Sequence, residues 1–267
     1  FTKLTATQGG GSLRGNASVD LGRMRYQANL TAQRLPLQNF LPHMGLSPFT
    51  GTLVAQGAGT DLMSPATALQ LKAQIKSFCY GHYDLSGVDA DANVRQGHIL
   101  ADIASRNPLL SGNIQLNALT QSKRLRATVS GDVTQVDLHT LGLSQQPLKA
   151  AICAHIDVES DLKQFHKVQG FISDITVITD KKNYRLHDVV LDVLTSRDTT
   201  HAVINSGDFA LNMDGSGGYE HLLKRGNGFV SELQNQLKNK YIDQVRLRER
   251  LPDAHIYLTS GKDNILS

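Results

Sequence analysis

The 267-residue chain has no tryptophan, and phenylalanine and tyrosine together make up only 6% of it. A β-sandwich of this length usually builds its core around large aromatic side chains. Hydrophobic residues are 40% of the chain, and most of them are aliphatic. The composition therefore argues against a closed sandwich with a filled core.

Metal, redox and membrane-spanning signals are also missing. The two cysteines, Cys79 and Cys153, lack metal-binding or redox spacing, which leaves either a disulfide or two isolated buried thiols. The ten histidines are scattered singly, without the spacing of a metal site. No apolar run approaches the roughly 20 residues that span a bilayer. We expect no metal and no cofactor.

The sequence carries no recognisable catalytic motif. The glycine-rich segment 9–12 lacks the Lys-Ser/Thr ending of a phosphate-binding loop, and segment 215–218 lacks dinucleotide-binding spacing. No serine lies in a nucleophile elbow. The net charge of +3 is too small to indicate nucleic acid, and aromatic residues that could stack on bases do not alternate with the basic ones. We therefore expect neither an enzyme nor a nucleic-acid-binding protein.

The strongest positive signal is strict alternation of apolar and polar residues over long segments. Successive side chains of a strand point to opposite faces, so each such segment has one apolar and one polar face. The clearest cases are Met24–Gln33, Leu69–Lys76 and Val88–Arg95. At about 3.3 Å per residue, nine residues span about 30 Å. This predicts a mainly β fold, with at least ten long strands in an open, strongly curved sheet.

The apolar members of the alternating segments are expected to share the concave face and to form a groove. They are Met24, Tyr26, Leu30, Leu69, Leu71, Ile75, Val129, Ile152, Ile156, Val189, Leu191, Phe209 and Leu211.

The chain also aligns with itself at offsets of about 95 to 101 residues. Leu30–Ser47 matches Val129–Ser144, and Ser111-Gly112 matches Ser206-Gly207. Such a period is typical of stacked repeats, although alternating strands also match one another by chance. In each repeat a strand runs into a short helical turn, which we expect to place leucines over the open end of the sheet. The predicted units are 1–118 and 119–216 as groove repeats, 217–251 as a helical insert, and 252–267 as the start of a further strand unit.

The helical insert has apolar residues at steps of three and four, as in an amphipathic helix. We expect a short helix over Tyr219–Arg225, an interruption at Gly226–Gly228, and a longer helix that starts near Phe229. Pro252 then closes the block, and strand character returns at His255–Thr259. The expected lid over the groove is formed by Val230, Leu233, Leu237, Tyr241 and Val245. The alternative is that this basic helix lies on an anionic membrane surface.

These features together resemble the AsmA-like proteins, and most closely the TamB family of diderm bacterial envelopes. The resemblance is carried by Tyr26–Leu46, Leu125–Leu143 and, most specifically, Leu194–Met213. This last segment and the helical block after it look like the TamB-type proteins of the Bacteroidota. The chain starts at Phe1, and we expect it to be an internal or C-terminal-half fragment of such a protein.

The resemblance implies a large periplasmic protein anchored in the inner membrane, with a β-sheet that curls into a taco-shaped groove. Its implied partners are phospholipid acyl chains, an outer-membrane assembly barrel and the membranes at the two ends of the full-length protein. Its implied function is phospholipid transport between the inner and outer membranes. Two alternatives stay open: a β-sheet module that assists assembly or secretion of outer-membrane proteins, and a β-solenoid without a ligand. The family has no established catalytic residues, so none is assigned.

Overall fold

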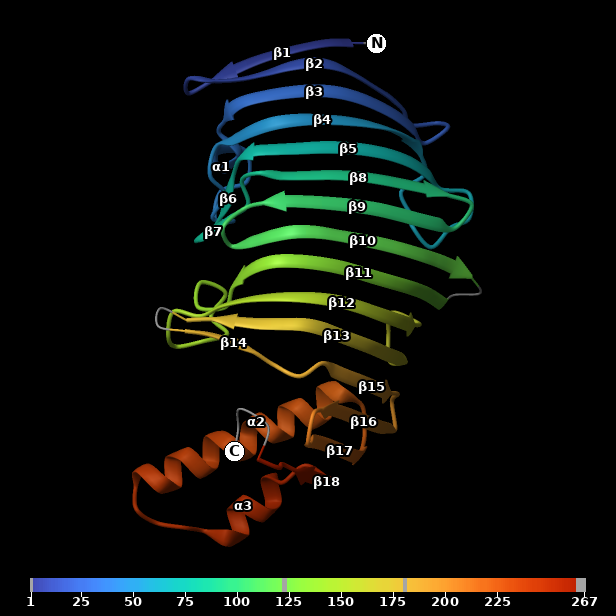
Figure 1. The fold of residues 1–267 in the computed structure, drawn as a ribbon. Helices are drawn as coiled ribbons and strands as arrows, with labels where there is room; N and C mark the ends of the chain where they lie inside the picture. The colour runs from blue at the N-terminus through green and yellow to red at the C-terminus, as the bar shows by residue number, and fades with distance from the viewer. Residues whose placement is uncertain (1, 122–123, 180–181, 263–267) are drawn as a thin grey trace. The chain divides into compact units, whose positions relative to one another are not determined.

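The computed structural model describes residues 2–121, 124–179 and 182–262. Sixteen strands form one open antiparallel sheet, in the order β1-β2-β3-β4-β5-β8-β9-β10-β11-β12-β13-β15-β16-β17-β18, with β14 paired to β13 (Figure 1). Apart from the small β6-β7 hairpin and β14, every strand pairs with its neighbours in sequence. The sheet is therefore a long meander, and the predicted open β architecture with at least ten strands is confirmed.

The strands of the first half are β1 (Thr2–Gln8), β2 (Gly11–Asp20), β3 (Arg25–Leu35), β4 (Phe49–Ala58), β5 (Ala68–Ser77), β6 (Cys79–Tyr80), β7 (Tyr83–Asp84), β8 (Val88–Arg95), β9 (His98–Arg106) and β10 (Leu110–Gln121). The later strands are β11 (Arg124–Asp137), β12 (Lys149–Ser160), β13 (His166–Ile178), β14 (Asn183–Arg185), β15 (Val189–Thr195), β16 (Thr199–Ser206), β17 (Phe209–Ser216) and β18 (Ala254–Thr259). The helices are α1 (Leu37–Phe40), α2 (Tyr219–Lys238) and α3 (Gln244–Arg250).

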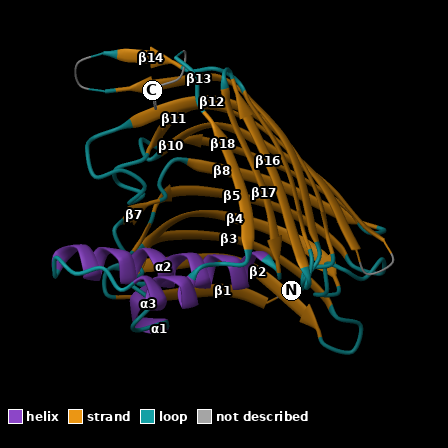
Figure 2. Ribbon diagram, turned by 90° about the horizontal axis from the view of Figure 1, so that it is seen from below, coloured by secondary structure: helices purple, strands orange, loops and turns teal. Residues whose placement is uncertain are grey.

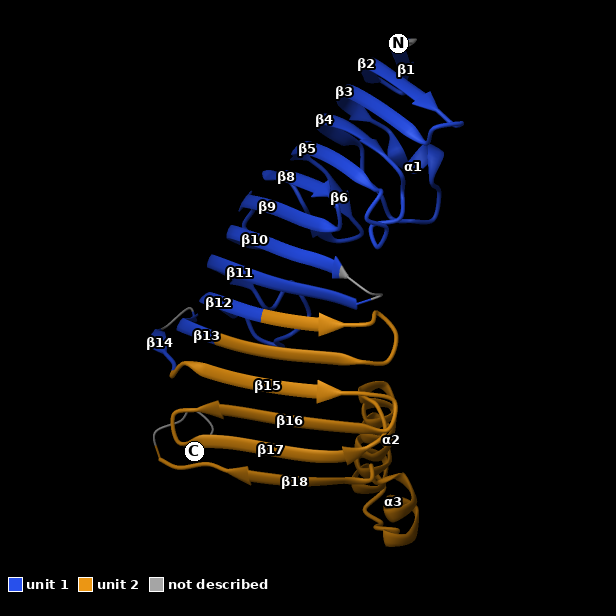
Figure 3. Cartoon of the chain, turned by 90° about the vertical axis from the view of Figure 1, so that its right-hand side faces the viewer, with its two compact units in different colours: residues 1–156, 172–186 blue, residues 157–171, 187–267 orange. Residues whose placement is uncertain are grey.

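Contacts divide the chain into two compact units (Figure 3). Unit 1 comprises residues 1–156 and 172–186, and unit 2 comprises residues 157–171 and 187–267. The division passes through β12 and β13, so each of these strands contributes residues to both units.

The sheet lacks a conventional core. Among the described residues no large side chain is fully buried. The buried apolar residues are mainly small, and five of them are alanines: Ala32, Ala118, Ala127, Ala150 and Ala202. A β-sandwich would instead bury large side chains between two layers. The scarcity of aromatic residues is thus matched by a sheet that carries no packed second layer of strands.

The three alternating segments are strands, as predicted, and they correspond to β3, β5 and β8. Strand length also agrees, because β11 contains 14 residues against a usual five or six. Met24 is an exception: it lies in the turn before β3, with a φ of 48°, and its side chain is exposed.

Short helical turns follow β3 and β11, as the repeat predicted. After β3 the turn is α1; after β11 the amide of Leu141 donates to the carbonyl of Asp137 at 3.2 Å, and Gly142 has a φ of 75°. The expected role of the leucines is wrong for Leu41 and Leu143, which are exposed. Their turns end in bends that direct these two side chains to solvent.

The expected interruption at Gly226–Gly228 is also wrong, because α2 is one continuous helix over Tyr219–Lys238. A helical glycine costs only about 1 kcal/mol relative to alanine, which tertiary packing readily offsets. Leu222 is buried against Gly215 at the start of α2, and further along the helix the Arg225 guanidinium donates to the carbonyl of Leu251. These contacts hold α2 before the glycines, and the buried Gln236, which bonds to the backbone of Asp243, holds it after them. The predicted return to a strand after Pro252 is confirmed by β18.

Both cysteines are free, Cys79 in β6 and Cys153 in β12. Desolvation, and then the carboxylates of Asp132 and Asp174, raise the pKa of the Cys153 thiol. The thiol therefore stays protonated at neutral pH and is a poor nucleophile. None of the described helices has the length and apolar character needed to cross a membrane.

Candidate functional site

The register of the strands in unit 1 produces one apolar face that extends from β3 to β11. Residues directly opposite each other on neighbouring antiparallel strands point to the same side of the sheet. The central row of opposed residues is Leu30, Leu53, Ala73, Ala90, Ile103, Ile114 and Gly131. Every member of this row is apolar or glycine.

Three further rows run parallel to the central one, because every second residue of a strand returns to the same face. On one side of the central row, the next row is formed by Ala28, Ala55, Leu71, Ala92, Ala101, Leu116 and Val129. The row beyond it is formed by Tyr26, Gly57, Leu69, Val94, Ile99, Ala118 and Ala127. On the other side of the central row, the row is formed by Ala32, Gly51, Ile75, Val88, Ser105, Gly112 and Val133. Only Tyr26 and Ser105 have polar side-chain atoms, and their hydroxyls donate to the carbonyls of Gly59 and Leu110. We call these four rows the unit 1 apolar face.

The footprint of this face is large. Seven strands about 4.8 Å apart and four rows about 6.8 Å apart give roughly 29 Å by 20 Å, a footprint on the order of 600 Å². The largest apolar patch on a typical monomeric protein is about 300–600 Å² and is often functional. The footprint of the unit 1 apolar face is of this order, and the members of it whose side chains are buried are Ala32, Val94, Ser105, Ala118, Ala127 and Val133.

Strand β12 adds two of the expected residues to the same face. Its His155 Nδ1 lies 3.0 Å from the Ser130 hydroxyl, and the Cys153 thiol lies 3.8 Å from a carboxylate oxygen of Asp132. Ser130 and Asp132 point away from the unit 1 apolar face, because they alternate with Val129, Gly131 and Val133. The even-numbered residues of β12 in unit 1, including Ile152 and Ile156, consequently lie on the apolar side.

The opposite face of unit 1 is polar and carries cross-strand pairs. Lys72 Nζ lies 3.0 Å from the Asp91 carboxylate, and the Arg106 guanidinium lies 2.6 Å from that of Asp89. Hydrogen bonds from Gln74 and then Arg106 hold the pKa of Asp89 below its usual value. Each exposed pair contributes little stability, but together they keep this face hydrated.

Two hollows over this sheet are lined more by polar than by apolar residues. The larger one, of about 650 Å³, lies over β2, β3, β4, β5 and β8 and includes Arg25, Gln56, Gln70 and Arg95. A second, of about 510 Å³, is lined by Lys72, Asp89, Asp91 and Asp102 among others. In the second hollow Asp91 pairs with Lys72, and Asp89 pairs with Arg106. Both hollows are also lined by members of the unit 1 apolar face, such as Leu69 and Val94 in the first and Ile103 and Ile114 in the second, and we assign them no role.

Unit 2 has its own apolar face on β15–β18, again defined by register. Its rows of opposed residues are Val189, Ser206 and Phe209; then Leu191, Ile204, Leu211 and Leu258; then Val193, Ala202, Met213 and Ile256; and finally Thr195, Thr200, Gly215 and Ala254. The last row is partly covered by Leu222 of α2. There Thr195 accepts a hydrogen bond from the amide of Tyr219 at 3.0 Å, which fixes the start of α2.

The expected lining residues are grouped by these registers. Those on the apolar side of unit 1 are Tyr26, Leu30, Leu69, Leu71, Ile75, Val129, Ile152 and Ile156. Those on the apolar face of unit 2 are Val189, Leu191, Phe209 and Leu211. Met24 belongs to neither set, because it lies in the turn before β3 and not in the strand itself.

Several residues of the apolar faces were not foreseen from the sequence. Strand β4 contributes Gly51, Leu53, Ala55 and Gly57, and β9 and β10 contribute the isoleucines at 99, 103 and 114. The signal in β4 is weak because two of its four face positions are glycine and Val54 lies on the polar side. A search for alternation that accepts glycine as an apolar-face residue would have found this strand.

The expected lid residues do not form a buried stripe. Of the five, only Leu233 is partly buried, whereas Val230, Leu237, Tyr241 and Val245 are exposed. Tyr241 lies in the loop after α2, and Val245 belongs to α3. The side of α2 that packs contains Leu222, Phe229, Leu233 and Gln236, and α3 packs against it. The lid expectation is therefore wrong for these four exposed residues. The contacts of α2 are made by the neighbouring stripe through Leu222, Phe229 and Leu233.

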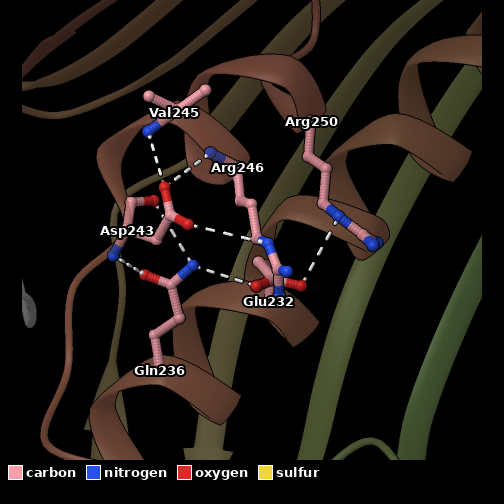
Figure 4. Close-up of polar contacts among 6 residues, drawn as sticks. All are labelled: Glu232, Gln236, Asp243, Val245, Arg246 and Arg250. Atoms are coloured by element: carbon pink, nitrogen blue, oxygen red, sulfur yellow. Dashed lines mark hydrogen bonds and ion pairs between the residues drawn. The ribbon is translucent and has the colours of Figure 1, made fainter.

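A polar network joins α2 to α3 (Figure 4). The buried amide of Gln236 accepts from the backbone amide of Asp243 at 2.6 Å and donates to a Glu232 carboxylate oxygen at 2.9 Å. The Asp243 carboxylate accepts from the amides of Val245 and Arg246, which caps α3. The Arg250 guanidinium lies 3.5 Å from the second Glu232 oxygen. We call α2, α3 and the loop between them the helical hairpin.

Replacing Gln236 with leucine should loosen this hairpin without unfolding the sheet. The substitution leaves the Asp243 amide without its acceptor, which costs about 1–3 kcal/mol when the group stays buried. Hydrogen exchange of the α3 amides should accelerate in Gln236→Leu, while the amides of β8–β10 keep their protection. Gln234→Leu, on the exposed side of the same helix, is the matched control and should change neither. Equal protection of α3 in both variants would contradict the assigned role.

Comparison with known proteins gives no match: no family model, no curated protein and no solved structure is similar to this chain. Among the described residues no group of histidines, cysteines and carboxylates could hold a metal ion. The candidate site thus stands on its own geometry, as one apolar face in each of the two units.

Proposed function

We propose that this chain is a segment of an envelope protein whose sheet forms a curved groove that conducts phospholipid acyl chains. The observation that carries the proposal is the unit 1 apolar face, whose four rows across seven strands contain only aliphatic residues and glycine apart from Tyr26 and Ser105. In the proposed setting the full-length protein is anchored in the inner membrane, spans the periplasm and transports phospholipids to or from the outer membrane. This chain acts there as a passive conduit and not as an enzyme.

The chemistry of the face suits mobile acyl chains. Exposing two tails of about fifteen methylenes each to water costs roughly 24 kcal/mol, at about 0.8 kcal/mol per methylene. A lipid that leaves a membrane therefore needs an apolar surface along its whole path. The hydroxyls of Tyr26 and Ser105, the two polar side chains in the four rows, donate to the carbonyls of Gly59 and Leu110, so neither offers an unpaired donor to a headgroup.

Small residues give the face a second useful property. Alanine and glycine occupy 13 of the 28 positions of the four rows and lie between larger side chains such as Leu71, Leu116 and Ile75. Such a surface is shallow, and it lacks the closed pockets that select one ligand shape and hold it tightly. A conduit requires weak contacts that are repeated along its length, because a single tight binding site would hold the lipid in place.

A second candidate function is supported by the edges of the sheet. Among the described strands, β1 pairs only with β2 and β18 only with β17. An unpaired edge can accept a further strand from an unfolded outer-membrane protein. This mechanism uses backbone groups of the edge and makes no use of the apolar face.

Lipid extraction followed by mass spectrometry of the purified chain separates the two candidates. The chain should be isolated without detergent from a diderm bacterial host. We expect co-purified phospholipids of several headgroup classes, since the apolar face contacts only the tails. A chain free of lipid that cross-links to unfolded outer-membrane protein through β1 would replace the first proposal with the second.

A further inference from the structure

The tip of the helical hairpin combines exposed apolar side chains with uncompensated positive charge. We define the tip as residues 237–248. Its exposed apolar residues are Leu237 (59% exposed), Tyr241 (65%), Ile242 (49%) and Val245 (68%). Four such residues within nine positions are not the scattered exposed leucines of an ordinary surface.

The charge of the tip is strongly one-sided. It contains four basic residues, Lys238, Lys240, Arg246 and Arg248, and one acidic residue, Asp243, so its formal charge is +3. The chain as a whole also carries +3, from 27 basic and 24 acidic residues, so the remainder is balanced. Within the described part of the chain Lys238, Lys240 and Arg248 form no ion pair. The Asp243 carboxylate accepts from the two amides that it caps and lies 3.6 Å from the Arg246 guanidinium, so the three other basic residues of the tip carry the excess charge.

The hairpin presents this tip away from the sheet of unit 2. Helix α2 starts where β17 ends, and its far end projects away from β15–β18 (Figures 1 and 2). From Leu222, which contacts the sheet, to Leu237 there are 15 residues, or about 22 Å at 1.5 Å per residue. The polar network around Gln236 holds the two helices together at this distance. The tip thus lies at the end of two helices that are fixed to each other by hydrogen bonds.

We propose that the tip of the helical hairpin docks onto an anionic membrane surface. Apolar side chains would enter the headgroup and upper acyl region, while the lysines and arginines contact lipid phosphates. Tyr241 suits the interface because its ring is apolar and its hydroxyl is polar. A second copy of the chain is a poorer occupant, since a symmetric contact would bring +3 against +3. The inference does not rest on the conduit function, because the tip and the unit 1 apolar face share no residue.

Co-sedimentation with vesicles tests the proposal on the whole chain. Vesicles of phosphatidylcholine with phosphatidylglycerol should bind it, pure phosphatidylcholine vesicles should bind it weakly, and added salt should weaken the first interaction. Lys238→Gln with Lys240→Gln should reduce binding roughly 25-fold, at about 5-fold for each basic residue near an anionic surface. Lys3→Gln with Lys76→Gln removes the same charge from exposed strand positions and should leave binding unchanged.

The apolar contribution is tested separately. Tyr241→Ser with Val245→Ser should reduce binding at least roughly 10-fold, because both side chains would leave the interface. Val54→Ser with Leu100→Ser, two exposed residues on the polar face of the sheet, is the control. All four variants should retain co-purified phospholipid, which distinguishes this proposal from the conduit. Equal binding to both kinds of vesicle, equal loss in the controls, or a dimer in sedimentation velocity that Tyr241→Ser abolishes would each overturn it.

Discussion

Leu71→Asp should reduce phospholipid occupancy of the chain about 30-fold, whereas Gln70→Asp should leave it unchanged. The two residues are neighbours on β5, but Leu71 lies in a row of the unit 1 apolar face and Gln70 lies on the polar face. A carboxylate at position 71 would remove contact with two to three methylenes, worth about 2 kcal/mol at 0.8 kcal/mol each. Binding of a fluorescent phospholipid to the purified chain is the measurement. Ile75→Asp should repeat the effect from the neighbouring row.

Folding must be controlled in this comparison, because Leu71 is half-buried. Leu71→Asn places a neutral polar group at the same position and should weaken binding in the same direction. Circular dichroism should show an unchanged strand signal for each variant used. Equal losses from Leu71→Asp and Gln70→Asp in folded protein would show that lipid does not use this face.

Gly112→Ala is expected to be strongly destabilising. Gly112 has a φ of 145° at the register shift in β10, and an added Cβ would meet the Asp132 carbonyl oxygen at 2.2 Å. The strained backbone and the forced separation of β10 from β11 should together cost roughly 3–5 kcal/mol. Denaturant unfolding should report this loss as a lower midpoint.

Gly131→Ala provides the matched control. Gly131 lies on β11, on the same face of the sheet, and its φ is not positive. An added Cβ there would meet its nearest neighbours at 3.8–3.9 Å, which is ordinary van der Waals contact. Its unfolding midpoint should therefore stay close to that of the parent chain. Similar midpoints for Gly112→Ala and Gly131→Ala would contradict the close strand approach at Gly112.

The strands could be predicted from the sequence because each half of the alternation has a distinct environment. In β5, Leu69, Leu71 and Ile75 share a face without a second layer of strands, while Gln70 and Lys72 face solvent. The polar side of these strands packs against no second layer in the described residues, so its positions stay polar and the two-residue alternation is clear in the sequence. The apolar face of glycine-rich β4 was not predicted, because a glycine has no side chain whose polarity would show which side of the sheet it faces.

The helical hairpin was harder to predict, for a physical reason. Two apolar stripes run side by side on α2, one through Leu222, Phe229 and Leu233 and the other through Leu223, Val230 and Leu237. Both have helical spacing, so the sequence cannot decide which stripe packs. The choice depends on α3, which the buried Gln236 and the Asp243 cap fix against one side. Those polar contacts between residues seven positions apart carry no periodic signal.

The central claim, that acyl chains lie on the apolar faces, is tested most directly by site-specific photocrosslinking. Benzoylphenylalanine should be placed singly at Leu71 and Leu211 on the apolar faces, and at Gln70 and Asn212 on the opposite sides of the same strands. After irradiation in bacteria, mass spectrometry should find phospholipid adducts at Leu71 and Leu211 and none at Gln70 or Asn212. Equal lipid adducts at all four positions, or polypeptide adducts in place of lipid at Leu71 and Leu211, would contradict the account.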